Sequence, residues 1–113
     1  MRYFLALLSV FLALPAWAQD QVNTVTPFNA SVGVTSAQVV AVATQPARKL
    51  LYLVNPSDTD VWCEFGAAAV VSTSSVFLKN GGGGMLFDVR VPQQAVNCIT
   101  TVAGKTIVGG EGR

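Results

Sequence analysis

KLLYLVNPSDTDVWCEFG, residues 49–66, contains two runs of apolar or alternating side chains separated by a short polar segment. Alternation with a period of two is typical of a β-strand that has one face on a core. The polar segment Asn55-Pro56-Ser57-Asp58 predicts a tight turn, because proline fixes φ and the Asn, Ser and Asp side chains can bond the local backbone. We therefore expect two strands joined by a turn.

Short β-type runs and turn residues also alternate over the rest of residues 37–113. No segment has the period of an amphipathic helix, and residues 67–71, the single candidate, are short and uncapped, so we expect a strand or loop crossing there. The pattern predicts an all-β fold, a small single-domain antiparallel β-sandwich or barrel of about seven strands. The other runs are AQVVAVA, AAAVVSTSSVFL, MLFDVRV, AVNCITTV and KTIVGG, separated by QPAR, KNGGGG, PQQ and AG.

Residues 1–18 are predicted to be a signal peptide. Arg2 supplies the positive n-region, residues 4–14 are apolar apart from one serine, and Ala16-Trp17-Ala18 has the small-x-small pattern of signal-peptidase cleavage. A retained membrane anchor is the alternative. The apolar run is shorter than the ~20 residues that span a bilayer, so we expect no stable membrane insertion after cleavage.

The exported part is predicted to be one domain preceded by an arm. Residues 19–36, rich in Thr, Ser, Val and Asn, are expected to form an extended N-terminal arm or an edge strand, and residues 37–113 the β-sandwich domain. Removing Arg2 from the 7 basic residues leaves six, against 6 acidic ones. A net charge near zero gives no electrostatic footprint for nucleic acid, so we expect the protein to bind none. The leader predicts that the protein is periplasmic or extracellular.

Cys63 and Cys98 are the only cysteines, and both lie in the part predicted to meet an oxidising compartment. Alternation places Cys63 on one face with Val61 and Phe65, and Cys98 on one face with Val96. Each cysteine thus falls on a plausible inward face. The sequence predicts a disulfide between them, with two buried free thiols as the alternative.

Tyr52 and Trp62 occupy positions opposite to the predicted core faces, if Leu51 and Leu53 point inward. An outward Trp–Tyr pair flanked by Glu64 is a candidate contact surface for a partner protein or a sugar. Burial of either aromatic ring under a loop is the alternative.

Few residues suit catalysis or the binding of a metal or cofactor. Without histidine, no Ser-His or Cys-His pair can be built. Asp58 and Asp60 alternate as calcium ligands do, but the further carboxylate and central glycine of such a loop are missing, so we interpret them as turn carboxylates. Residues 103–106 resemble the end of a P-loop without its first glycine, and residues 81–84 predict a flexible hairpin loop. We expect no enzyme, metal or cofactor.

Several features of residues 34–106 together form a recognisable pattern. Gln45-Pro46-Ala47-Arg48-Lys49 leads into a hydrophobic strand, Gly66 ends the next strand after the turn, and Val91-Pro92 precedes Ala95-Val96. In these features the chain resembles small β-rich proteins encoded in the structural gene regions of tailed phages and prophages. The resemblance implies a virion-associated or capsid-decorating role without catalytic residues. The chain departs from that group in its leader and its two cysteines.

Two functions from different classes follow as hypotheses. The first is a non-enzymatic exported structural or interaction protein that assembles with itself or with a larger particle through strand edges or its outer aromatic face. The alternative is a periplasmic module that recognises a glycan or another protein, as an inhibitor does, through Tyr52, Trp62 and the glycine-rich loop. A small hydrolase would rest on the carboxylates of Asp58, Asp60 and Glu64 alone.

Overall fold

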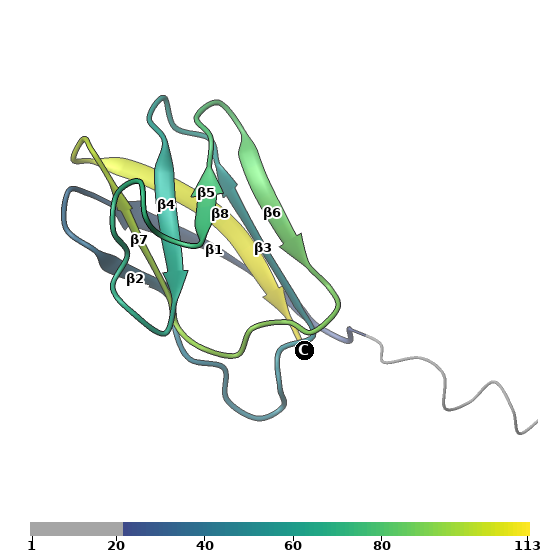
Figure 1. Ribbon diagram of the computed structural model, residues 1–113. Coiled ribbons are helices and arrows are strands. Elements are labelled where there is room, and N and C mark those ends of the chain that lie inside the picture. Colours follow the sequence, from purple (N-terminus) through teal and green to yellow (C-terminus); the bar gives the residue numbers. More distant parts are fainter. Residues whose placement is uncertain (1–21) are drawn as a thin grey trace, which may run out of the picture.

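The computed structural model describes residues 22–113 of the chain. These residues form eight strands in two antiparallel sheets, joined by loops and turns (Figure 1). The predicted signal peptide and its cleavage site lie outside these residues. The all-β sandwich prediction is confirmed, with one strand more than the seven expected. The strands are β1 (Val25–Val32), β2 (Ala37–Val40), β3 (Leu50–Asn55), β4 (Val61–Phe65), β5 (Val76–Leu78), β6 (Gly83–Phe87), β7 (Val96–Thr100) and β8 (Lys105–Gly112).

Each sheet combines strands that are distant in the sequence. The first, called sheet A, has the order β1-β8-β3-β6, and the second, called sheet B, has the order β2-β7-β4-β5. The turn after β3 therefore does not close a hairpin within one sheet. It carries the chain from sheet A to sheet B, so that β3 and β4 lie in different layers (Figure 1).

The segment expected to be an arm contributes a strand to sheet A. β1 pairs with β8 along its whole length, from Val25 opposite Gly112 to Val32 opposite Lys105. Val32 is only 2% exposed and belongs to the core. From Val25 onward, the N-terminal segment is an edge strand, which is one of the two structures that its composition allowed.

The core lies between the two sheets and is built from alternate residues of the strands, as the period of two predicts. In β3 the buried positions are Leu51 and Leu53, and the side chains between them are half-buried on the outer face. Phe65 of sheet B and Phe87 of sheet A meet edge to face, with ring centroids 5.4 Å apart, and pack against this core. The remaining core residues include Val32, Val61, Cys63, Leu78, Val96, Cys98 and Ile107.

The predicted turn at Asn55 is present and makes a tertiary contact as well as local ones. The fully buried Asn55 side chain accepts a hydrogen bond from the backbone N–H of Ser57 through Oδ1, at 3.1 Å. Its Nδ2 donates to the carbonyl oxygens of Thr59 and Leu78, at 2.8 and 2.9 Å. The same side chain thus shapes the turn and ties it to β5 of the other sheet.

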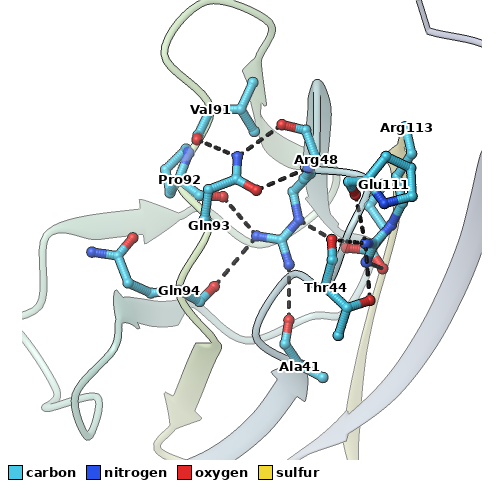
Figure 2. Close-up of polar contacts among 10 residues, drawn as sticks. Ala41, Thr44, Arg48, Val91, Pro92, Gln93, Gln94, Glu111 and Arg113 are labelled. Atoms are coloured by element: carbon cyan, nitrogen blue, oxygen red, sulfur yellow. Dashed lines mark hydrogen bonds and ion pairs between the residues drawn. The ribbon is translucent and has the colours of Figure 1, made fainter.

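A buried guanidinium closes the opposite end of the sandwich (Figure 2). Arg48 is 2% exposed, and its Nε donates to Glu111 at 2.8 Å. Its Nη1 donates to the carbonyl oxygens of Pro92 and Gln94, at 2.7 and 3.3 Å, and its Nη2 donates to that of Ala41 at 2.8 Å. One side chain therefore joins the loop after β2, the loop before β7 and strand β8.

Two further side chains complete this network (Figure 2). The amide of Gln93 bonds both the backbone N–H and the carbonyl of Arg48, each at 2.8 Å. Arg113 donates from Nη1 to the carbonyl oxygens of Thr44 and Pro46, at 2.6 and 3.0 Å. Among the described residues no buried side-chain nitrogen or oxygen lacks a partner, so the polar groups at this end are satisfied.

Candidate functional site

The predicted Trp–Tyr contact surface is not formed as one surface. Tyr52 lies on β3 in sheet A, whereas Trp62 and Glu64 lie on β4 in sheet B. All three occupy outward positions, as the alternation predicted, but the outer faces of two packed sheets point away from each other. The prediction of one site that combines Tyr52 with Trp62 is therefore wrong, and the outer face of each sheet is a separate surface.

The outer face of sheet A carries no charged side chain. Residues directly opposite each other in antiparallel strands share a face, so the strand register identifies the outward positions. Val25 and Leu86 are the most exposed large ones, at 49% and 61%. We call this surface the apolar face. Its outward residues are Val25, Pro27, Asn29, Ser31, Leu50, Tyr52, Val54, Gly84, Leu86, Thr106, Val108, Gly110 and Gly112.

Two glycines of β8 make the apolar face flat. A Cβ at Gly110 would lie only 2.7 Å from the ring and hydroxyl of Tyr52, so this ring lies across β8 where a side chain would otherwise stand. A Cβ at Gly112 would lie 2.5 Å from Val22 in the same way. Absence of side chains at these glycines allows neighbouring apolar groups to lie on the sheet instead of projecting from it.

The charged residues near sheet A gather at the two ends of the sandwich instead. At one end Lys105 pairs with Asp58, with Nζ and Oδ1 2.7 Å apart. At the other end Glu111 pairs with Arg48 and, at 3.3 Å, with Arg113. The apolar face is thus a neutral surface between two charged rims.

The outer face of sheet B is aromatic but more polar. Trp62 stands opposite Phe77 on β5 and opposite Ile99 on β7, and the two aromatic rings lie 5.5 Å apart at a tilt of 43°. Phe77 is 48% exposed. In the next row Glu64 stands opposite Asn97. We call this surface the aromatic face.

The Glu64 carboxylate is held in a specific contact. It accepts hydrogen bonds from the backbone N–H of Ser75 at 2.7 Å and from the Ser75 hydroxyl at 3.0 Å. These bonds, the backbone one first, favour the charged form and lower the pKa of Glu64 below its ordinary value of 4.5. Glu64 therefore fastens the loop before β5 to strand β4.

We predict that this contact makes stability depend on pH. Because the pKa of Glu64 is lower in the folded chain than in the unfolded chain, its contribution is present above pH 4.5 and is lost as the pH falls below that value. Glu64→Gln should therefore lower the melting temperature at pH 7 and lower it less at about pH 3. Asp88→Asn, at an exposed loop position, is the matched control. Equal losses at both pH values for Glu64→Gln would contradict the prediction.

The turn carboxylates are also engaged in local contacts. The hydrogen bond and charge of Lys105 lower the pKa of Asp58, and the hydroxyl of Thr59 contributes further. Asp60 accepts a hydrogen bond from the backbone N–H of Asn80 at 2.9 Å. Within residues 22–113 no cluster of three or more His, Cys, Asp or Glu side chains is placed to hold a metal ion. The arrangement supports the interpretation of Asp58 and Asp60 as turn residues.

The glycine-rich loop directs its amides toward its own fold. The N–H groups of Gly81 and Gly82 donate to the carbonyl oxygens of Ser57 and Asn55, both at 2.8 Å. Both glycines have positive φ, 75° and 111°, which side-chain-bearing residues rarely adopt. The loop therefore packs on the turn after β3, and residues 83–84, expected in the loop, begin strand β6 instead.

The predicted disulfide between Cys63 and Cys98 is confirmed. The two residues stand directly opposite each other on β4 and β7, with Cα atoms 4.1 Å apart, and both are fully buried. The crosslink lies on the inner face of sheet B and joins neighbouring strands within that sheet. Such a bond is compatible with an oxidising compartment.

Comparisons of the chain with protein-family models, with curated proteins and with solved structures found no match in any of the three. In the part of the chain that is described, no helix is long and apolar enough to cross a membrane. On the geometry described above, the apolar face and the aromatic face are the two candidate sites.

Sequence reasoning missed most of the apolar face. It assigned the outward position to Tyr52 but not to Val54, Leu86 or Val108. A signal was present, because the run LLYLV is apolar at both parities and thus predicts a strand with two apolar faces. What the run could not show is which other strands extend that second face.

Proposed function

We propose that this chain is a non-enzymatic exported interaction protein, of the virion-associated or decoration type, that binds a protein partner through its apolar face. The uncharged outer surface of sheet A carries the proposal. A solvated sheet face ordinarily alternates polar residues with the buried ones, and charges keep it soluble. This face has no charged residue, and its outward residues are mainly Val, Leu, Tyr, Pro and Gly, with Asn29, Ser31 and Thr106 as neutral polar ones.

The dimensions of the face suit a binding surface. Four strands about 4.8 Å apart and five to eight residues long cover about 20 by 25 Å, or about 500 Å². Apolar patches of about 300–600 Å² are the largest found on typical monomers and are often functional. The neutral chemistry favours a partner surface that is itself apolar and predicts binding that changes little with ionic strength.

Three further observations support an exported assembly role. The leader predicts export, and the buried disulfide is compatible with that location. The resemblance to small proteins of phage structural regions supplies the class of partner, a repeated protein surface on a particle. Binding by a preformed rigid face needs no reactive group, and the flat outer surface of sheet A, packed on the crosslinked sheet B, provides such a face.

The proposal is tested by co-sedimentation of the purified, oxidised chain with tailed-phage particles and with cell-envelope fragments from its own source. We expect saturable binding to one of these, lost at least about tenfold in Val108→Lys, which places a charge at the centre of the apolar face. Gln38→Lys, on the outer side of sheet B, is the control and should bind as the parent does. Absence of binding to both samples, or unchanged binding of Val108→Lys, would refute the proposal.

The alternative function, glycan binding, is favoured by one observation, the pair of the half-buried Trp62 and the exposed Phe77 on the aromatic face. Aromatic rings beside a carboxylate and an amide can stack on a sugar and bond its hydroxyls. Because Trp62 is the only tryptophan after residue 17, its fluorescence reports on this face alone. Titration with soluble peptidoglycan fragments should change that fluorescence in the parent and not in Phe77→Ala. A flat titration of the parent removes the alternative.

A further inference from the structure

Each sheet of the sandwich ends in two edge strands, and three of the four carry features that hinder pairing with another chain. β1 contains Pro27, which lacks a backbone N–H. β2 has only 4 residues and a register irregularity between Gln38 and Val40. β5 has only 3 residues. Proline, bulges and short strands are the usual protections of sheet edges against association.

β6 has none of these protections. Its sequence, GGMLF, contains no charge and no proline, and its register with β3 runs without a break from Phe87 opposite Leu51 to Gly83 opposite Asn55. Met85 and Leu86 are 39% and 61% exposed. In Figure 1, β6 is the outermost strand of its sheet, beside β3. From Gly84 to Phe87 this edge is apolar and regular, while the N–H of Gly83 already donates to the carbonyl oxygen of Lys79 at 3.0 Å. An apolar, regular edge is a template for strand addition.

We propose that β6 pairs with β6 of a second copy of this chain, antiparallel, about a twofold axis through Met85. In this register the two Met85 residues stand opposite each other. Leu86 stands opposite Gly84 of the second copy, and Phe87 stands opposite Gly83 of the second copy. The result is one continuous sheet of eight strands across two copies.

The sequence of β6 is complementary to itself in this register. On the outer side of the sheet Leu86 of each copy faces Gly84 of the other, which has no side chain, and at the axis the two flexible Met85 side chains meet. In a twofold contact, a residue near the axis meets the same residue of the other copy. No charged residue lies near this axis, so no like charges meet there. An axis through Gly84 would place Leu86 and Phe87 opposite Gly82 and Gly81, which precede β6 and bond the turn after β3, and one through Leu86 would place Phe87 opposite Met85. The Met85-centred register is therefore the one that keeps every pair within the strand.

This contact uses the edge of sheet A, whereas the proposed function uses its outer face. Pairing at the edge leaves the apolar face open and makes it continuous over both copies. Either proposal can thus fail while the other stands, and Met85, on the inner side of β6, separates them because it does not belong to the apolar face.

The first test is the mass of the oxidised chain in solution, measured by light scattering over a range of concentrations. We expect a dimer in the parent, and in Met85→Lys a dissociation constant raised at least about tenfold, because two like charges would meet at the axis. Val102→Lys, a similarly exposed position in the turn before β8, should dimerise as the parent does. A monomer in the parent at all concentrations, or a dimer unchanged by Met85→Lys, would overturn the proposal. Circular dichroism establishes that each variant is folded.

The second test is a crosslink that does not depend on the strength of the dimer. Met85→Cys places one new thiol beside its own copy, at the separation of directly opposite residues in neighbouring strands, where a disulfide can form. Oxidation should therefore give a covalent dimer from Met85→Cys and little from Val102→Cys, since the native cysteines are already paired. Equal crosslinking in both variants, or none in Met85→Cys, would count against the β6 contact.

Discussion

Replacing Arg48 with alanine is expected to lower the free energy of unfolding by about 3–5 kcal/mol, the range for removing one partner of a buried ion pair. The native guanidinium is 2% exposed and bonds a carboxylate and three backbone carbonyl groups. Alanine would leave all of these acceptors without their donor in the closed end of the sandwich. Unsatisfied buried polar groups each cost about 1–3 kcal/mol, so several small losses combine into a large one.

The measurement is equilibrium unfolding in urea, followed by the fluorescence of Trp62. Arg48→Lys should recover only part of the loss, because a single ammonium group can pair with Glu111 but cannot reach toward Ala41 and Pro92 at once. Lys79→Ala, which removes a positive charge from an exposed loop position, should change stability by less than about 0.5 kcal/mol. A loss below about 1 kcal/mol for Arg48→Ala would show that water replaces the guanidinium.

Removal of the disulfide by the double substitution Cys63→Ala and Cys98→Ala is expected to cost about 3–4 kcal/mol. The two residues are 35 positions apart, and in the chain-entropy model a loop of that length restricts the unfolded state by this amount. Both sulfurs are fully buried in the core, so the smaller side chains also lose packing. Small domains are often stable by only about 5–10 kcal/mol, which makes this a large share of the total.

Two measurements separate the effect of the crosslink on the unfolded chain from the effect of the smaller side chains on packing. Without it the unfolded chain is more expanded, so the denaturant slope of the free energy should increase together with the loss of stability. The parent protein unfolded and refolded under reducing conditions should show the entropic part of the loss without the change of side chains. An unchanged midpoint in the double variant would mean that the crosslink is dispensable to the fold.

Much of the fold could be predicted because β-structure leaves a local signature. Alternation assigned Leu51, Leu53, Cys63 and Cys98 to inward faces, and each is fully buried. The turn at Asn55 was readable because proline and small polar residues restrict the backbone locally. The disulfide followed from the same parity, since two inward cysteines in one small core have few other partners.

The contacts between strands could not be predicted in the same way. Tyr52 and Trp62 were each placed outward correctly, yet they face opposite sides of the molecule because β3 pairs with β6 and β8 and not with β4. Nothing in the sequence separates the buried Arg48 from its neighbour Lys49. The burial of Arg48 depends on loops that reach it from residues 41 and 92–94.

By itself, then, the sequence determined the class of fold, the inward and outward sides of β3, β4 and β7, the main turn and the crosslink. Each of these depends on residues a few positions apart or on parity within one strand. Only the tertiary structure decided which outward residues share a face, that the apolar residues gather on sheet A, and that β6 remains the unprotected edge. These features depend on which strands are neighbours, and strand order is set by packing between segments far apart in the chain.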